Sequence, residues 1–237
     1  IRRPFPTAQL DSLDPFLMLD EVGPKDWGPG EAVGAPDHPH RGFETISYIL
    51  SGEKLHEDST GDRQILRPGD VQWMTAGSGI VHSEMPSPAM REGGGRAHSF
   101  QIWLNLPRQY KMAAPRYQFV AGDETPIGGS ADGLVSVKVI AGQAYGVQAV
   151  INTHTPVTLQ DWTMRPGGRS DPLTPADQQM ALYIFKGNLA VGSDGQSVDE
   201  GKLIIFGAGD SIELAVNNEA GEAARFLLFG GVPIGEP

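Results

Sequence analysis

The chain contains no cysteine, so it has neither disulfide bonds nor thiolate metal ligands, and histidine and carboxylate side chains remain as the candidate ligands. Basic residues are also scarce, because 18 Lys and Arg stand against 29 Asp and Glu for a net charge of -11. Non-specific nucleic-acid binding depends on phosphate neutralisation by Lys and Arg, so we expect no direct nucleic-acid binding. No apolar run approaches the length of a membrane helix and no signal peptide is recognisable. We therefore expect a cytoplasmic protein without membrane association.

Glycine and proline are abundant, with 31 Gly and 19 Pro, as is typical of short strands joined by tight turns rather than of long helices. Residues 45–50 are β-branched and aromatic, which favours a strand. Apolar and polar residues alternate over residues 97–106, as in a strand with two different faces. The patterns predict an all-β chain.

The first candidate site is the sequence His38-Pro39-His40, followed by Glu44. In a strand, alternate side chains share a face, so His38 and His40 point the same way. Glu44 joins them if the strand stays regular through Gly42, but a bulge at this glycine would re-aim the carboxylate. A His-x-His pair alone is a weak signal.

The second candidate site is His82-Ser83-Glu84, which has the same spacing and follows the turn at 77–79. If the two strands lie side by side, His38, His40 and His82 converge with one carboxylate, either Glu44 or Glu84. Imidazoles with one carboxylate suit a divalent transition metal such as Fe, Mn, Ni, Cu or Zn. Four protein ligands in an octahedral field leave two positions open, as a catalytic site requires.

These motifs resemble those of the pirin family within the cupin superfamily. The resemblance is dense from about residue 10 to 107 and is carried by three stretches: 14–21 (DPFLMLDE), 38–45 (HPHRGFET) and 72–77 (QWMTAG). It implies that His38, His40, His82 and Glu84 bind one divalent metal, iron in the first place. Glu44 is then a partner of the ligands or a proton acceptor, and the catalytic candidates are Glu84 and Glu44.

The second half of the chain echoes the first. Residues 181–187 resemble residues 46–52 with an offset of 135 positions. We therefore predict two tandem, jelly-roll-like cupin barrels with few short helices: a metal-binding domain over 1–127 and a second barrel over 128–237. At that offset His38, His40 and Glu44 fall on non-ligating residues, namely Leu173, Pro175 and Gln179. The second barrel is thus expected to lack a metal.

The resemblance implies a dioxygenase of the quercetin 2,3-dioxygenase type, acting on a flavonol-like aromatic substrate and O2. An alternative is a regulatory module without catalytic activity, in which the metal modulates binding of a protein partner. A third is another cupin chemistry, such as an isomerase or carbohydrate-directed enzyme, because the fold alone does not define the reaction.

Two further expectations concern the surroundings of these motifs. His56 lies near the end of a short strand and is expected at the surface. Residues 87–96 are rich in glycine and are expected to form a solvated connection.

Overall fold

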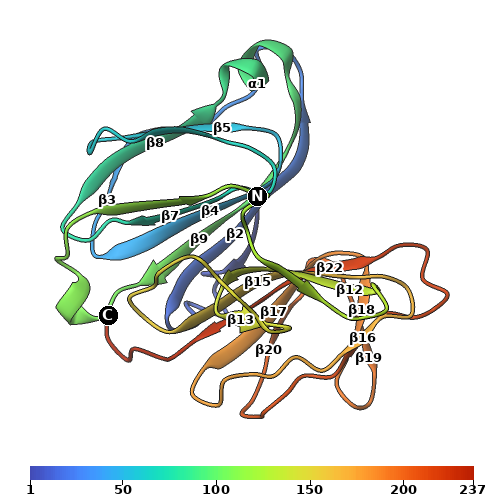
Figure 1. Ribbon diagram of the computed structural model, residues 1–237. Coiled ribbons are helices and arrows are strands. Elements are labelled where there is room, and N and C mark those ends of the chain that lie inside the picture. The colour runs from blue at the N-terminus through green and yellow to red at the C-terminus, as the bar shows by residue number, and fades with distance from the viewer. The chain divides into compact units, whose positions relative to one another are not determined.

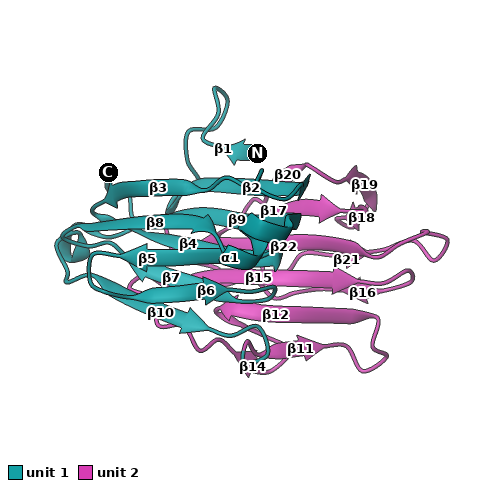
Figure 2. Ribbon diagram, turned by 90° about the horizontal axis from the view of Figure 1, so that it is seen from above, with its two compact units in different colours: residues 1–124, 234–237 teal, residues 125–233 magenta.

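A computed structural model describes residues 1–237, and nearly all of its regular structure is β. The chain forms two compact units, distinguished by colour in Figure 2: unit 1 contains residues 1–124 and 234–237, and unit 2 contains residues 125–233. The helices are α1 (Pro88–Gly93) and the 3-10 turn η1 (Arg108–Tyr110). Neither has the length and apolar character needed to cross a membrane.

Unit 1 is a sandwich of two antiparallel sheets (Figure 1). Its six-stranded sheet has the order β1 (Arg2–Phe5), β2 (Phe16–Trp27), β9 (Gly95–Asn105), β4 (Phe43–Ser51), β7 (Val71–Thr75) and β10 (Arg116–Val120). Its four-stranded sheet has the order β3 (Ala35–His40), β8 (Ile80–Pro86), β5 (Lys54–Asp58) and β6 (Arg63–Leu66).

Unit 2 repeats this plan. Its six-stranded sheet has the order β11 (Ile127–Gly129), β12 (Val135–Ala141), β15 (Val157–Met164), β22 (Ala224–Gly231), β17 (Gln179–Lys186) and β20 (Leu203–Ile205). Its four-stranded sheet has the order β16 (Arg169–Ser170), β21 (Leu214–Ala215), β18 (Asn188–Val191) and β19 (Gln196–Asp199), and a hairpin joins β13 (Gln143–Ala144) to β14 (Val147–Gln148).

The two units share one topology. The order β2-β9-β4-β7 in unit 1 corresponds to β15-β22-β17-β20 in unit 2, and β3-β8-β5-β6 corresponds to β16-β21-β18-β19. This confirms the predicted all-β chain with a tandem repeat. In neither unit do the strands close into one continuous hydrogen-bonded barrel, so each unit is a pair of sheets.

Strand β9 shows how the six-stranded sheet of unit 1 uses its two faces. Phe100, Ile102 and Leu104 are buried on one face. The alternating residues Gln101 and Trp103 project from the other face, where they line a cavity of unit 1. The alternation predicted over residues 97–106 therefore separates an apolar face from the face that carries the cavity.

The interior of unit 2 is apolar. Sixteen buried residues form one cluster between its sheets, and it includes Trp162, Leu182, Leu214 and Phe226. The rings of Trp162 and Phe226 stack with their centroids 5.9 Å apart. Unit 2 therefore has a large apolar core between its sheets.

The segment 87–96 is more ordered than the sequence indicated, because it contains α1. The Ser87 hydroxyl accepts a hydrogen bond from the Met90 backbone N–H at 3.1 Å, and Pro88 occupies the first turn. Both are favourable helix-start features. The segment is a largely exposed connection, as expected, but the sequence analysis did not foresee the short helix in it, because the glycines at 93–95 obscured the cap.

Leu182 gives a direct test of the unit 2 core, because its side chain is fully buried. Leu182→Ala should lower the free energy of unfolding by about 2–5 kcal/mol through lost burial and a residual cavity. Leu173→Ala is the matched control, because Leu173 is 84% exposed, and should change stability by about 0.5 kcal/mol or less. Urea denaturation of the two variants measures both effects, and equal values would contradict the assigned core.

Candidate metal centre

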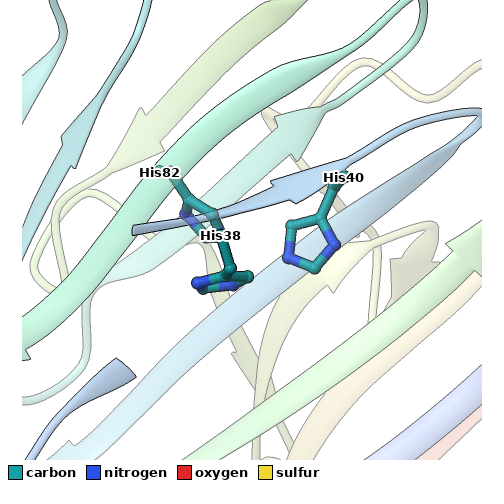
Figure 3. Close-up of side chains that lie close together, drawn as sticks. All are labelled: His38, His40 and His82. Carbon is teal, nitrogen blue, oxygen red and sulfur yellow. The ribbon is translucent and has the colours of Figure 1, made fainter. Parts of the chain in front are cut away.

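Strands β3 and β8 bring three histidines together. The antiparallel register pairs His38 with His82 and His40 with Ile80, so both β3 histidines lie beside the β8 histidine. One ring nitrogen from each of the three lies within 4.8 Å of the others. Figure 3 shows the three rings gathered in this way. We call His38, His40 and His82 the imidazole cluster.

The ring nitrogens of the cluster are available to a cation. The Nδ1 of His38 lies 2.7 Å from the Pro36 carbonyl oxygen, and because a carbonyl only accepts, this nitrogen carries the proton and Nε2 is free. The Nε2 of His82 is buried without any hydrogen-bond partner. A buried polar atom without a partner is costly, and a metal ion on the free Nε2 atoms would satisfy it.

Burial keeps two imidazoles of the cluster, those of His40 and His82, neutral. It lowers the pKa of His40 to about 4, an effect that repulsion from His38 increases and attraction by Glu84 opposes. Burial also lowers the pKa of His82 to about 4, again against the attraction of Glu84. Neutral imidazole is the form that binds metal, so His40 and His82 can accept a cation at pH 7 without first losing a proton.

Glu84 is the carboxylate beside the cluster. It lies on β8 two residues after His82 and lines a cavity together with His38 and His40. Burial alone would raise the pKa of Glu84, but the ammonium of Lys54 at 4.0 Å, the Ser47 hydroxyl, which donates to it at 2.5 Å, and two neighbouring imidazoles hold that pKa below its ordinary value. Glu84 is therefore an ionised, oriented acceptor.

Glu44 projects from the other face of its sheet. Phe43 lines the cavity and Ser47 contacts Glu84, so the strand alternation directs Glu44 away from the cluster. Its carboxylate is fully buried and accepts a hydrogen bond from the Thr75 hydroxyl at 2.6 Å. Gly42 explains why Glu44 points away from the cluster. Its φ of 80° lies in the left-handed region that favours glycine, and it allows the chain to turn from β3 into the other sheet.

His56 contradicts the sequence expectation, because it is fully buried rather than at the surface. Its Nδ1 lies 3.4 Å from Nδ1 of His82, and its Nε2 lies 2.9 Å from Oδ2 of Asp58. The surface prediction was wrong because β5 lies inside the four-stranded sheet, between β8 and β6. The His-x-Asp spacing at 56–58, which puts both side chains on one strand face, was the available signal.

Two cavities lie beside Glu84 within unit 1: one of about 610 Å³, which adjoins the imidazole cluster, and one of about 820 Å³, which does not reach the histidines of the cluster. His38, His40 and Trp103 line the smaller cavity, while Ile49 and Lys54 are among the residues around the larger one. Four residues line both cavities: Asp20, Ala35, Glu84 and Gln101. Space for an organic molecule thus extends from the cluster past Glu84.

Glu44 should make the metal-free protein lose stability as pH rises. Burial raises the pKa of Glu44, although the hydrogen bond from Thr75, the nearby indole of Trp73 and the charge of Arg116 oppose the shift. Between the ordinary carboxyl pKa and this raised value the folded state holds more protons than the unfolded state, so the free energy of unfolding falls with pH by at most about 1.4 kcal/mol per unit. Below this pH range Glu44 causes no loss of stability, and above it the loss has reached its full size.

Glu44→Gln should remove that dependence and become more stable than the parent above this pH range. Glu57→Gln is the control, because Glu57 is an exposed carboxylate on β5. Urea denaturation of chelator-treated protein from pH 4 to 8 compares the three proteins. A Glu44→Gln variant that loses stability relative to the parent as pH rises contradicts the assignment.

Comparison with known proteins agrees with this architecture. Residues 1–104 match the family model described as Pirin, and residues 159–237 match the one described as Pirin C-terminal cupin domain. A pirin-like protein of Solanum lycopersicum is 41% identical over 238 residues, which cover 100% of this chain and 77% of that protein. The sequence likeness therefore extends well beyond the motifs of the first half.

Solved structures share the fold. Quercetin 2,3-dioxygenase from Acinetobacter baumannii matches with a TM-score of 0.88 and 32% identity, over 95% of this chain and 77% of that chain. The bacterial pirin YhhW from Escherichia coli, solved in complex with nickel(II), matches with a TM-score of 0.73 and 20% identity, over 97% and 88% of the two chains. The family matches, the tomato relative and the shared topology of the two units confirm the resemblance drawn from the sequence, and the chain belongs to the pirin family, with two cupin domains.

Proposed function

We propose that this pirin-family chain is a metal-dependent dioxygenase of the quercetin 2,3-dioxygenase type, which cleaves a flavonol-like substrate with O2 in the cytoplasm. The observation that carries the proposal is the imidazole cluster at the wall of a cavity. Its three nitrogens converge within 4.8 Å beside space of about 610 Å³. The quercetin 2,3-dioxygenase from Acinetobacter baumannii supports the choice of reaction, since it shares both fold and a third of the sequence.

The ligands in this proposal are His38, His40, His82 and Glu84. Three imidazole nitrogens and one carboxylate oxygen suit iron, with nickel, manganese, copper and zinc as alternatives, and nickel is the ion held by the E. coli pirin. When bound, the metal supplies a Lewis acid that favours the ionised form of a flavonol hydroxyl.

Glu84 also receives the proton that the flavonol hydroxyl loses. Its carboxylate is ionised and borders both cavities. The hydroxyl of Ser47 holds one of its oxygens, so the carboxylate is positioned before substrate arrives. Lys54, 4.0 Å away, stabilises the negative charge until the proton is transferred.

The cavities bind a planar aromatic substrate. Trp103 and Phe43 form apolar walls beside His40, with ring centroids 5.3 Å and 5.2 Å from its ring. One part of a flavonol lies against these rings. The remainder extends past Gln101, which lines both cavities, into the larger one. Enclosure by these walls limits the access of water to the ionised substrate.

Metal content separates the two carboxylates. Glu84→Gln should weaken metal binding by more than the roughly 10–100-fold typical of residues behind the ligands, because a neutral amide replaces an anionic ligand. Glu44→Gln is the matched control and should keep the metal, because Glu44 projects from the opposite face. Elemental analysis of both variants, purified without chelator, gives the answer. A larger loss in Glu44→Gln would overturn the proposed ligand set.

Turnover is tested with quercetin and protein loaded with each of the five metals. The absorbance of quercetin should fall faster than with the same free metal, and His40→Ala should reduce the rate to that background. His154→Gln is the control, because His154 belongs to unit 2 and lines neither cavity of unit 1. No loss of absorbance above the free-metal background with any metal would exclude flavonol cleavage.

A metal-loaded protein without turnover would favour the alternative, a metal-modulated module that binds another protein. A pull-down from cell extract with metal-loaded and chelator-treated protein would then identify metal-dependent partners.

A further inference from the structure

We propose that Asp58 and His56 are positioning residues that fix the tautomer of His82, so that its Nε2 lone pair faces the metal position. The inference rests on the proposed metal site but not on the dioxygenase reaction. It assigns a role to a buried chain of side chains that lies behind the imidazole cluster.

This row of contacting side chains is continuous and closed to solvent. Oδ2 of Asp58 lies 2.9 Å from Nε2 of His56, and both side chains are 0% exposed. On the other side of the ring, Nδ1 of His56 lies 3.4 Å from Nδ1 of His82, at the long end of the hydrogen-bond range. The ring of Tyr117 stacks on His56 with centroids 5.0 Å apart and planes 27° apart, which holds the His56 ring in its plane.

The polarity of the chain begins at Asp58. Burial alone would raise the pKa of Asp58, but hydrogen bonds from Thr60 and His56 hold it below its ordinary value. The carboxylate only accepts, so Nε2 of His56 carries a proton and donates it. The Nδ1 of His56 is then an acceptor. Gln72 supports this assignment, because its amide Nε2 donates to Nδ1 of His56 at 3.1 Å.

The consequence reaches His82. Nδ1 of His56 then presents one lone pair, which the Gln72 amide and the ring of His82 both face. A lone pair on Nδ1 of His82 would repel it, whereas an N–H there is attracted to it, so His82 carries its proton on Nδ1 and its lone pair on Nε2. This is the nitrogen that is buried without a partner. Every group in the chain thus favours one tautomer of His82, the one that can bind a cation from the side of the imidazole cluster.

Asp58→Asn should reverse this polarity. The other carboxylate oxygen, Oδ1, accepts hydrogen bonds from the backbone N–H of Thr60 at 2.8 Å and of Asp62 at 3.3 Å. These donors keep an oxygen at that position, so the amide nitrogen of the variant faces His56. His56 then carries its proton on Nδ1, and His82 carries its proton on Nε2, where it blocks the metal.

Asp62→Asn is the matched control. It removes the same charge from the same turn, and Asp62 contacts the Thr60 hydroxyl at 3.1 Å rather than His56. The backbone N–H of Asp62 that holds Asp58 is unchanged in this variant.

The experiment is 15N NMR of the histidine rings in metal-free protein at neutral pH, with nickel affinity measured by competition with a chelator. In the parent and in Asp62→Asn, His82 should be protonated on Nδ1 and His56 on Nε2. In Asp58→Asn, His82 should be protonated on Nε2, and nickel affinity should fall by roughly 10–100-fold, while Asp62→Asn stays within about threefold of the parent.

A parent protein whose His82 is protonated on Nε2 overturns the inference, and this spectrum decides the matter even if Asp58→Asn fails to fold. So does an Asp58→Asn variant that keeps the parent tautomers and affinity. A parent that shows the expected tautomers but binds no metal contradicts the metal site, and with it the role of the chain. Loss of quercetin turnover alone, with tautomers and nickel binding as expected, contradicts only the proposed reaction.

Discussion

The pairing of β3 with β8 is the constraint on which the candidate site depends. It sets His38 opposite His82, and a slip by one residue would turn one of the two histidines to the outer face of the sheet. Gly34 shows how closely the two strands approach as β3 begins, because a Cβ at this residue would lie 2.4 Å from the Glu84 carbonyl oxygen. Only a residue without a side chain fits there. The close pairing of β3 with β8 therefore depends on glycine at this position, and the same pairing brings the imidazoles together.

The same topology supports two different interiors. In unit 2, Ser170 pairs with Leu214 across β16 and β21, the two strands that correspond to β3 and β8 of unit 1. Leu214 belongs to the apolar cluster of unit 2, whereas His82 contacts the buried polar chain of His56 and Asp58. Strand order therefore defines the sandwich, and a few inward-facing residues decide whether it holds hydrocarbon or a polar centre.

Much of this arrangement could be predicted from residue spacing. Alternation along a strand is a local property, so it correctly placed His38 with His40 and predicted the two faces of β9. The repeat between residues 46–52 and 181–187 correctly indicated two related units. The choice between Glu44 and Glu84 was not available from spacing, because it depends on how the chain turns at Gly42, and only the family resemblance favoured Glu84.

The error at His56 arose because long-range pairing overrides local pattern. His56 lies on a short polar strand, and nothing local shows that β8 and β6 flank it on both sides. The hydrogen bond between His56 and Gln72 likewise depends on a strand that is distant in sequence. The hydrogen bond between His56 and Asp58 depends on a turn that Asp58 itself holds. The return of the tail to unit 1, where the Glu236 carbonyl accepts a hydrogen bond from Asn105 at 3.0 Å, is another contact without a sequence signal.

The central claim is that one cation binds the imidazole cluster through free Nε2 atoms. Anomalous diffraction from crystals of the full chain soaked in nickel tests it most directly. The account predicts one strong peak in unit 1, at about 2.0–2.2 Å from Nε2 of His38, His40 and His82 and from a carboxylate oxygen of Glu84. A peak bound through Nδ1 of His82, a peak on other residues, or no peak at the cluster would contradict it.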